Sequence, residues 1–393
     1  MDRRLHAVVL PPGPRLYAAL AAALDGSGPA ICPISPDLPG AALQDLLNAL
    51  APHAVETADG LRPYRPRSAC VPIAGVPAAP ETAVLIATSG STGVPKIVEL
   101  SAGALRASAS ATFTRIGAEP GDRWLCCLPT SHIAGVQVLV RSLAAGTEPV
   151  IQPRFDVTAV AGADVAHLSL VPTQLRRLLA AGTDLSKFRS VLLGGAAAPP
   201  DLLDAARERG ARIFTTYGMS ETSGGCVYDG VPLDGVRADI GGDGRIRLAG
   251  PVLFSGYRLR PGLTESAWDG DWFVTQDLGV LDDGRLRVRG RADDVIVTGG
   301  EKVVAGEVAA ALSRHPNVAD VVVVGRPDPE WGHRVTAVVV PAGRPPVLDE
   351  LRGWVRETMP ACAAPRELRV VTEIPLLPSG KPDLETLRRP APR

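Results

Sequence analysis

The segment Thr88-Ser89-Gly90-Ser91-Thr92-Gly93-Val94-Pro95-Lys96 directly follows the apolar run Ala83 to Ala87, which has the composition of a buried strand. Its glycines allow backbone N–H groups to close around an anion, its hydroxyls add donors, and Lys96 adds a positive charge. The spacing differs from GxxxxGK[ST], so this is not a Walker A loop. A polar surface turn can have the same composition, but the position after an apolar strand favours a phosphate-binding loop.

Strand-like and helical runs alternate from residue 83 onward, which predicts an α/β fold. The predicted strands are 83–88, 124–128, 167–171, 191–193 and 212–215, and the predicted helices are 100–116, 133–145, 173–181 and 200–209. Strands in such units are usually parallel and buried on both faces. We therefore expect the ligand beyond their carboxyl ends, where loops lead into helices.

Two domains are predicted from changes in the pattern of apolar runs and turn residues along the chain. The large N-terminal α/β domain covers 1–291 and includes a β-rich subdomain at about 225–290, where Gly and Asp turns indicate hairpins. The remaining segment, 292–393, reads as helix, strand, strand, helix and strand, and it is large enough to fold alone as an α+β domain.

Charge and apolar patterning exclude several classes of partner. The 41 basic residues nearly cancel the 42 acidic ones, so no field of one sign would attract nucleic acid or an anionic membrane, and a small molecule is the expected partner. The run Leu16 to Leu24 is too short to span a bilayer, and Pro11, Pro12 and Pro14 interrupt any secretion signal. Six cysteines without a CxxC pair fit a reducing cytoplasm.

Lysine is rare in this chain, because only four of the 41 basic residues are lysines. Arginine is used wherever a general positive charge is sufficient. A compact ammonium has a geometry that the planar guanidinium cannot reproduce at a tight site. Lys96, Lys302 and Lys381 therefore attract attention as chemical groups.

Five further motifs, together with the phosphate loop, follow the order found in adenylate-forming enzymes, a family of acyl-CoA synthetases, peptide-synthetase adenylation domains and luciferases. They are Leu193-Gly194-Gly195-Ala196, Thr216-Tyr217-Gly218-Met219-Ser220-Glu221-Thr222, Thr275-Gln276-Asp277, Arg289-Gly290-Arg291-Ala292-Asp293-Asp294 and Pro378-Ser379-Gly380-Lys381. Because six motifs match in order, the chain resembles this family over most of its length.

The resemblance implies ATP, Mg²⁺ and CoA as ligands and assigns a role to each motif. The nucleotide-binding positions it implies are Thr88, Ser89, Gly90, Ser91, Thr92, Gly93, Lys96, Gly194, Gly195, Ala196, Thr216, Tyr217, Gly218, Thr222, Asp277 and Arg291. It also implies that Glu221 is a catalytic residue that binds Mg²⁺, that Lys381 is the catalytic ammonium, and that a mobile C-terminal domain pivots at Asp293. The implied CoA-binding residues are Gly299, Gly300 and Lys302.

Each of these residues has an ordinary structural alternative when it is considered alone. Glu221 could be a solvated charge, although it follows an apolar strand at 213–215, where a carboxylate could hold Mg²⁺. Tyr217 offers a ring to adenine, but buried tyrosines more often belong to the core. Asp277 could be a turn residue. Lys302 could form a surface salt bridge.

The segment Leu128-Pro129-Thr130-Ser131-His132-Ile133-Ala134-Gly135 resembles the acyl-site motif of acyl-CoA synthetases, in which the catalytic-site histidine, here His132, borders the carboxylate pocket. It lacks the Asp with which amino-acid activators pair the α-ammonium, so an amino acid is disfavoured. The chain looks most like the o-succinylbenzoate–CoA ligases of menaquinone biosynthesis. Their substrate has a second carboxylate, for which Arg141 is a candidate partner. If one helix covers both residues, however, a count of 100° per residue from His132 puts Arg141 on the opposite face, so we expect a structural role for Arg141.

The implied reaction has two halves: a carboxylic acid reacts with ATP to give an acyl-adenylate, and the CoA thiol then displaces AMP. The resemblance also implies that the C-terminal domain swings between them, carrying Lys381 away and bringing Gly299 and Gly300 to the thiol. Two alternatives stay open, namely an adenylase that loads a carrier-protein thiol and a non-catalytic nucleotide-binding relative. The sequence also leaves open whether the chain forms a homodimer.

Two departures from the family pattern concern Gln276, which replaces a glycine, and the N-terminal region. Gln276 could restrict the turn beside Asp277. Larger family members have well over a hundred additional residues before the phosphate loop, and this chain has 87. The short N-terminal region puts the wall of the acyl pocket in doubt.

Overall fold

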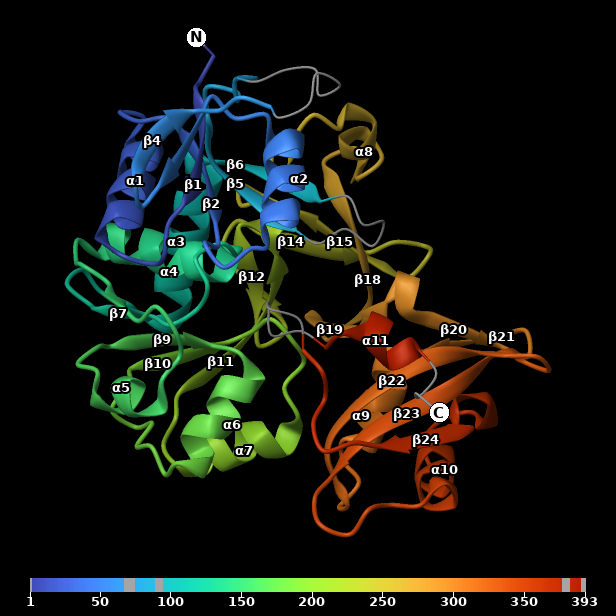
Figure 1. The fold of residues 1–393 in the computed structure, drawn as a ribbon. Helices are drawn as coiled ribbons and strands as arrows, with labels where there is room; N and C mark the ends of the chain where they lie inside the picture. The colour runs from blue at the N-terminus through green and yellow to red at the C-terminus, as the bar shows by residue number, and fades with distance from the viewer. Residues whose placement is uncertain (1, 67–74, 89–94, 377–381, 390–393) are drawn as a thin grey trace. The chain divides into compact units, whose positions relative to one another are not determined.

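The structure is a computed structural model that describes residues 2–66, 75–88, 95–376 and 382–389 (Figure 1). The chain divides into two compact units. Unit 1 consists of Met1–Gly195, Ala205–Arg237 and Leu248–Phe273, and unit 2 consists of Ala196–Asp204, Ala238–Arg247 and Val274–Arg393. Both units combine helices with sheets, so the predicted fold class, a large α/β part followed by a smaller α+β part, is confirmed.

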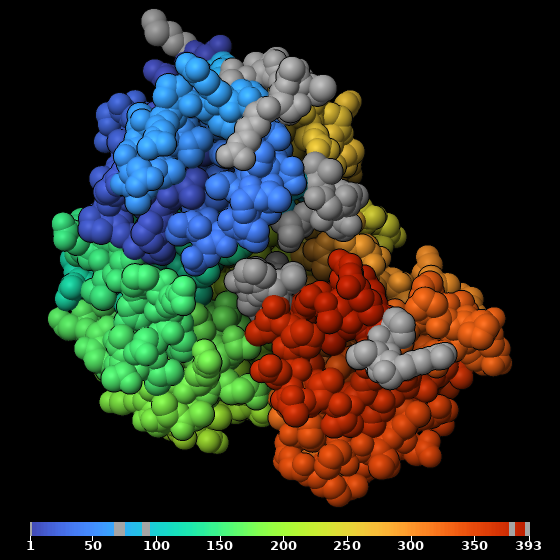
Figure 2. All heavy atoms as spheres, viewed as in Figure 1, coloured from blue at the N-terminus to red at the C-terminus, as the bar shows by residue number. Residues whose placement is uncertain are grey.

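The first sheet of unit 1 is built largely from the N-terminal residues, which form a continuous blue surface at the top of Figure 2. Its strands lie in the order β16 (Gly256–Tyr257), β6 (Lys96–Ser101), β5 (Thr82–Thr88), β2 (Ala30–Ile34), β1 (Leu5–Val9), β3 (Ala54–Thr57) and β4 (Gly60–Pro63). β1 runs parallel to β2 and β3, and the connecting helices are α1 (Pro14–Asp25) and α2 (Gly40–Leu50). The βα alternation therefore begins at residue 5 and not at residue 83.

The polar segment that begins at Thr88 connects the two strands of an antiparallel pair. Thr88 of β5 lies opposite Lys96 of β6, and the Thr88 hydroxyl donates to the Lys96 carbonyl at 3.2 Å. Strand β6 is followed by helix α3 (Ala102–Ile116), which is capped by the Ser101 hydroxyl. The expectation that ligand-binding loops lead directly into helices is thus wrong for this segment, because residues 96–101 form a strand between the loop and the helix.

The second sheet of unit 1 carries the parallel strands that the sequence predicts. Its order is β13 (Val231–Pro232), β12 (Gly224–Tyr228), β11 (Ile213–Met219), β10 (Ser190–Leu193), β9 (His167–Leu170), β7 (Trp124–Cys126) and β8 (Val150–Ile151). β10 is parallel to both β9 and β11, so the carboxyl ends of these three strands lie at the same edge. β11 continues beyond the predicted 212–215 because its last residues pair with the antiparallel strand β12.

Of the other helices of unit 1, those at 133–145, 172–180 and 200–208 match predicted helices to within one residue, and those at 157–162 and 261–265 were not predicted. The helices are α4 (Ile133–Ala145), α5 (Val157–Gly162), α6 (Pro172–Ala180), α7 (Pro200–Glu208), α8 (Pro261–Glu265) and the 3₁₀ turn η1 (Ser220–Thr222), with the first residues of α7 in unit 2. Helix α4 ends at Gly146, whose positive φ of 69° lets its N–H bond to the carbonyls of the last turn. Most of α4 is buried, and it packs against α3, β7 and β12.

Unit 2 begins with antiparallel strands and continues as an α+β arrangement. The first strands are β14 (Arg237–Ile240), β15 (Arg245–Ala249), β18 (Trp272–Asp282) and β19 (Arg285–Arg291), whose residues lie mostly in unit 2. The short β17 (Trp268–Asp269) belongs to unit 1 and pairs antiparallel with the start of β18. The second sheet has the order β21 (Glu301–Val304), β20 (Val295–Thr298), β23 (Gly332–Pro341) and β22 (Val318–Asp328), and β24 (Glu367–Val370) pairs with β23. The helices are α9 (Ala305–Leu312), α10 (Leu348–Arg356), α11 (Leu384–Arg388) and the turns η2 (Ala292–Asp294) and η3 (Ala361–Ala363).

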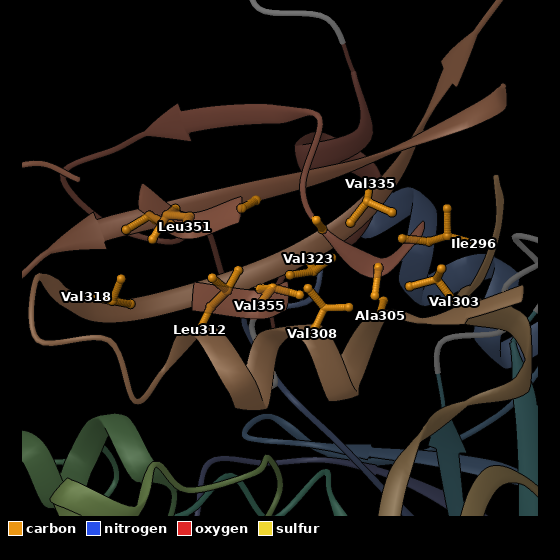
Figure 3. Close-up of a cluster of buried hydrophobic side chains, with 14 residues drawn as sticks. Ile296, Val303, Ala305, Val308, Leu312, Val318, Val323, Val335, Leu351 and Val355 are labelled. Carbon is orange, nitrogen blue, oxygen red and sulfur yellow. The ribbon is translucent and has the colours of Figure 1, made fainter. Parts of the chain in front are cut away.

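The core of this α+β arrangement lies between its sheet and its helices. Val308 of α9, Leu351 and Val355 of α10 and Val335 of β23 are fully buried members of one hydrophobic cluster (Figure 3). A fully buried aliphatic side chain of this kind contributes about 1.5–3 kcal/mol. The segment therefore has a hydrophobic core of its own.

Arg258, which follows β16, joins separate segments of unit 1. Its side chain is 3% exposed, and its guanidinium donates to the carbonyls of Leu50, Val76 and Pro77 and to the Glu99 carboxylate. Burial lowers the pKa of Arg258 and raises the pKa of Glu99. The charge on each residue opposes these shifts, because it favours the ionised form of the other. This guanidinium holds the end of α2 and residues 76–77 beside β6.

We predict that Arg258→Met lowers the free energy of unfolding by ~3 kcal/mol, because it leaves the Glu99 carboxylate and three carbonyls without their donor. The measurement is urea denaturation followed by circular dichroism. Arg62→Met is the control, because Arg62 is exposed in the same sheet, and we expect a change within about 0.5 kcal/mol. Equal losses for the two variants would contradict the assigned role.

Candidate active site

The predicted nucleotide-binding residues Gly194, Gly195 and Ala196 follow β10 at the carboxyl edge of the second sheet. Gly194 follows β10 directly, and a Cβ added there would lie 2.4 Å from the Thr216 hydroxyl on β11. Gly195 has a φ of 83°, a conformation that favours glycine, and it is exposed, as is Ala196. The two glycines therefore place bare backbone at the end of the sheet, where a flat ring could approach.

The signature after Thr215 forms the end of β11 and the turn η1. The pairing of β11 with β12 shifts between Tyr217 and Gly218, and a Cβ on Gly218 would come within 2.0 Å of the Gly224 carbonyl. Tyr217 is half-buried and therefore still presents part of its ring. Thr222 is fully buried with its hydroxyl bonded to backbone groups of the turn, which favours a structural role over direct nucleotide contact.

Glu221 and Lys96 both contact the side chain of Tyr257 in β16. The Tyr257 hydroxyl donates to Oε1 of Glu221 at 2.9 Å, and Nζ of Lys96 lies 5.2 Å from the centre of the Tyr257 ring. Burial, together with the Glu221 charge, raises the pKa of Tyr257 far above its ordinary value, so the phenol stays protonated and donates. The sequence did not indicate Tyr257, because a two-residue strand has no recognisable pattern.

The donor set around Glu221 fits a magnesium nucleotide. One carboxylate oxygen accepts from Tyr257, and the second makes no hydrogen bond to a described residue. In the part of the chain that the structure describes, no group of three or more His, Cys, Asp or Glu side chains could hold a metal ion. Mg²⁺ is commonly bound by one or two carboxylates with substrate phosphates and waters, so a single protein carboxylate is sufficient.

His132 occupies the position that precedes α4. Its backbone is extended, with φ −115° and ψ 151°, and its side chain is half-buried. A Cβ on Gly135 would come within 2.4 Å of the Pro129 carbonyl, so glycine allows the first turn of α4 to lie against residues 128–129. The acyl-site motif therefore forms a tight corner with His132 at the start of a buried helix.

Arg141 is buried in α4 without a carboxylate partner among the described residues. Its side chain stacks on the Trp124 ring at 5.3 Å, and Nη1 donates to the Ser169 hydroxyl at 3.4 Å. Its Nε makes no hydrogen bond, and burial lowers its pKa. The helix begins after His132, so a count of 100° per residue from His132 does not apply, and our reason for assigning Arg141 a structural role is wrong.

In unit 2, Arg291 contacts both Asp277, a predicted nucleotide-binding residue, and Asp293, the predicted hinge. Its guanidinium makes two hydrogen bonds of 2.8 Å to the Asp293 carboxylate and lies 3.5 Å from Oδ1 of Asp277, its partner across β18 and β19. The bonds to Asp293 raise the pKa of Arg291 and lower the pKa of Asp293. Gln276 lies in β18 with an exposed side chain, so its replacement of glycine is accommodated.

The predicted CoA-binding glycines form the turn between β20 and β21. Gly299 and Gly300 have φ values of 58° and 85°. Trp331 lies against this turn, because a Cβ on Gly299 would be 2.7 Å from its ring. The Arg366 guanidinium lies over the Trp331 ring, 3.8 Å from the ring centre. Lys302 is exposed on β21.

Several predicted site residues lie outside the described residues, namely Ser89, Gly90, Ser91, Thr92, Gly93 and Lys381. Thr88 and Lys96, which flank this loop, face each other at the ends of β5 and β6. The roles of the loop and of Lys381 remain predictions from their motifs.

A hydrogen-bonded Asp122, His167 and Ser190 arrangement has the residue types of an acyl-transfer triad. His167 Nδ1 lies 2.8 Å from the Ser190 hydroxyl, and Nε2 lies 3.0 Å from Asp122. His167 and Ser190 have no exposed surface and lie at the amino ends of β9 and β10. Without access for a substrate, this cluster is structural.

The sequence matches known families in two segments. Residues 4–257 match the AMP-binding enzyme family, and residues 307–381 match the AMP-binding enzyme C-terminal domain. A probable 2-succinylbenzoate–CoA ligase of Mycobacterium tuberculosis (strain ATCC 25618 / H37Rv) is 46% identical over 326 residues, covering 79% of this chain and 84% of that protein. No helix within the described ranges is long and apolar enough to cross a membrane.

Solved structures share the fold over nearly the whole chain. The o-succinylbenzoate CoA synthetase of Bacillus subtilis in complex with its acyl-adenylate intermediate has a TM-score of 0.84 and 28% identity, covering 99% of this chain and 88% of that one. An amide bond synthetase of Marinactinospora thermotolerans has the same TM-score and identity, covering 99% and 90%. With its N-terminal and C-terminal segments both matched, the chain belongs to the AMP-binding enzyme family, in agreement with the order of its adenylate-forming motifs.

Proposed function

We propose that this chain is an AMP-forming acid–thiol ligase that activates 2-succinylbenzoate with ATP and transfers the acyl group to CoA, as menaquinone biosynthesis requires. The names of the M. tuberculosis relative and of the B. subtilis structure support this substrate. The use of a nucleoside triphosphate is supported by the cluster of Lys96, Tyr257 and Glu221. The buried cysteines, Cys32, Cys126, Cys127 and Cys226, are free thiols, which supports a reducing, cytoplasmic compartment.

In the first half-reaction, a carboxylate oxygen of the acid attacks the α-phosphorus of ATP, and the bond to pyrophosphate breaks. Lys96 and the loop after Thr88 bind the phosphates, and Lys381 donates to the reacting oxygens. Magnesium bound at Glu221 would offset negative charge on the phosphates. The products are the acyl-adenylate and pyrophosphate.

In the second half-reaction, the CoA sulfur, having lost its proton, attacks the acyl carbon, and the bond to AMP breaks. Gly299 and Gly300 offer backbone without side chains along which the pantetheine arm can lie. The segment after Asp293 carries both this turn and Lys381. We propose that rotation at Asp293 removes Lys381 from the reacting groups after the first half-reaction and brings the Gly299–Gly300 turn to them for the second.

The observation that carries the choice of a dicarboxylic acid is the buried Arg141 guanidinium. A buried charge without a partner is costly, so an enclosed arginine with unused donors favours an anionic ligand. Its present contacts are the Trp124 ring, at the start of β7, and the Ser169 hydroxyl. The assignment is therefore tested by whether loss of Arg141 affects only the acid that has a second carboxylate.

We predict ATP-dependent formation of a CoA thioester from 2-succinylbenzoate, detected by mass spectrometry. The acid panel includes benzoate and an amino acid, and the acceptors are CoA, a phosphopantetheinyl carrier protein and a simple amine. We expect benzoate, which lacks the second carboxylate, to react at least about tenfold more slowly. Transfer to the carrier protein alone, or binding of ATP without pyrophosphate release, would favour one of the alternative functions.

We predict that Arg141→Met raises the KM for 2-succinylbenzoate by about 10- to 100-fold, the usual cost of losing a hydrogen bond to a charged group. Residual activity with benzoate should not change, because benzoate has no second carboxylate to lose. Arg141→Lys is the control that keeps the charge and should retain an intermediate affinity. A similar loss with both acids would show that Arg141 supports the fold and not the substrate.

We predict that Asp293→Pro allows adenylation, measured as ATP–pyrophosphate exchange, but slows thioester formation. Proline fixes φ near −65°, which suits the 3₁₀ turn that contains Asp293 and would hold the turn in this conformation. Asp293→Ala is the matched control, because it also removes the bond to Arg291 but leaves the backbone free.

Lys381→Ala should give the opposite result in the same assays. It should slow adenylation by about 10²- to 10³-fold while a supplied acyl-adenylate still reacts with CoA. If Asp293→Pro and Asp293→Ala behave alike in both half-reactions, Asp293 is not the pivot.

A further inference from the structure

Tyr257 contacts both Glu221 and Lys96, and no motif of the sequence analysis includes it. It is 7% exposed, and it follows Gly256 in the short strand β16. Its hydroxyl and its ring face make two different contacts: a hydrogen bond to the Glu221 carboxylate and a cation–π contact with the Lys96 ammonium. These contacts suggest a role beyond packing.

The Tyr257 ring is held in place by several neighbours. β16 pairs with β6 so that Tyr257 lies opposite Val98, and its N–H donates to the Thr264 hydroxyl at 2.8 Å. The Phe254 ring lies 4.9 Å from the Tyr257 ring and packs in turn against Trp268. Because the ring is enclosed in this way, its hydroxyl has a fixed position.

The hydrogen bond from Tyr257 restricts the orientation of the Glu221 carboxylate. The Glu221 carbonyl also accepts from the Phe254 N–H at 2.9 Å, so the backbone of this residue is fixed to the same segment as Tyr257. With Oε1 bonded to the phenol, Oε2 is the oxygen that a ligand can use. Hydrogen bonds of this kind to metal-binding carboxylates commonly contribute 10- to 100-fold to metal affinity or activity.

The ring face of Tyr257 acts on Lys96. Nζ lies 5.2 Å from the ring centre, within the range of a cation–π contact, and no carboxylate among the described residues forms an ion pair with it. The ammonium therefore stays available to an anionic ligand while its position is limited by the ring. A carboxylate partner would have neutralised it.

We propose that Tyr257 is a positioning residue for the adenylation half-reaction, whose hydroxyl orients Glu221 towards the metal-bound phosphates and whose ring places Lys96 beside them. This rests on the proposed function, because it assumes that Glu221 and Lys96 bind the nucleotide. The two contacts use different parts of one side chain, so they can be separated by substitution.

Tyr257→Phe removes the hydroxyl and keeps the ring. We expect the Mg²⁺ concentration for half-maximal adenylation to rise about tenfold, with little change in the KM for ATP at saturating Mg²⁺. Tyr257→Leu removes the ring as well, and we expect it to raise the KM for ATP a further ~2- to 10-fold through Lys96. Tyr64→Phe is the matched control, because Tyr64 is 8% exposed and its hydroxyl is bonded to Asn48, away from Glu221.

Calorimetric titration with ATP, with and without Mg²⁺, tests the proposal without any acid substrate. Mg²⁺ should increase ATP affinity in the unmodified protein and in Tyr64→Phe, increase it less in Tyr257→Phe, and have little effect in Glu221→Gln. Adding Tyr257→Phe to Glu221→Gln should cause no further loss of this gain, since the hydroxyl acts through Glu221.

Three results would overturn the proposal: an unaltered Mg²⁺ gain in Tyr257→Phe, an unaltered gain in Glu221→Gln, or a loss of thermal stability that accounts for every change. Failure of the proposed function has a different signature. The thioester assay would then give no product from any acid, while the calorimetric differences among these variants would remain.

Discussion

The pairing of β16 with β6 is the contact on which the candidate site of unit 1 depends. It involves only two residues of β16, and it brings a segment after residue 250 beside the strand that carries Lys96. The backbone bonds from Ser255 to Glu99 and from Arg258 to Ile97 extend the pairing on both sides, and Arg258 reinforces it through Glu99. A strand of two residues has little stability of its own, so the buried Arg258 guanidinium is a major part of what holds Tyr257 in place.

The sequence predicted the elements whose signals are local. Helix α4 was predicted with its observed bounds because an apolar run is enclosed between His132 and Gly146, and β5 and β10 were found because they are short apolar runs. The N-terminal strands were missed although Leu5–Val9 is also apolar, because the prolines and the short connections after it concealed the alternation. The predicted helix at 100–116 included Leu100 and Ser101, which are the last two residues of β6, and no strand was predicted at 96–99.

The parts of the site that sequence did not predict depend on contacts between distant segments. The bond between Tyr257 and Glu221 spans 36 residues, and its existence follows from the β6 and β16 pairing, which no periodicity indicates. For Arg141 the error was smaller: the residue was considered, but the helix was counted from a position where the backbone is still extended. Burial and the lack of a carboxylate partner among the described residues are properties that only the folded chain reveals.

The contacts of the basic residues show why the scarcity of lysine was informative, and also that scarcity alone does not identify a functional lysine. Arg3 and Arg115 each donate to several backbone carbonyls, a task that suits the planar fork of the guanidinium. Lys187 also binds two carbonyls, those of Ala161 and Ala163, so a retained lysine can be structural. Both lysines lie over a ring, Lys187 over Phe188 and Lys96 over Tyr257. Lys96 differs because its ammonium donates to no carbonyl and pairs with no carboxylate among the described residues, which leaves its charge for a ligand. The surroundings of a lysine, and not its rarity alone, therefore decide whether it belongs to the chemistry of the site.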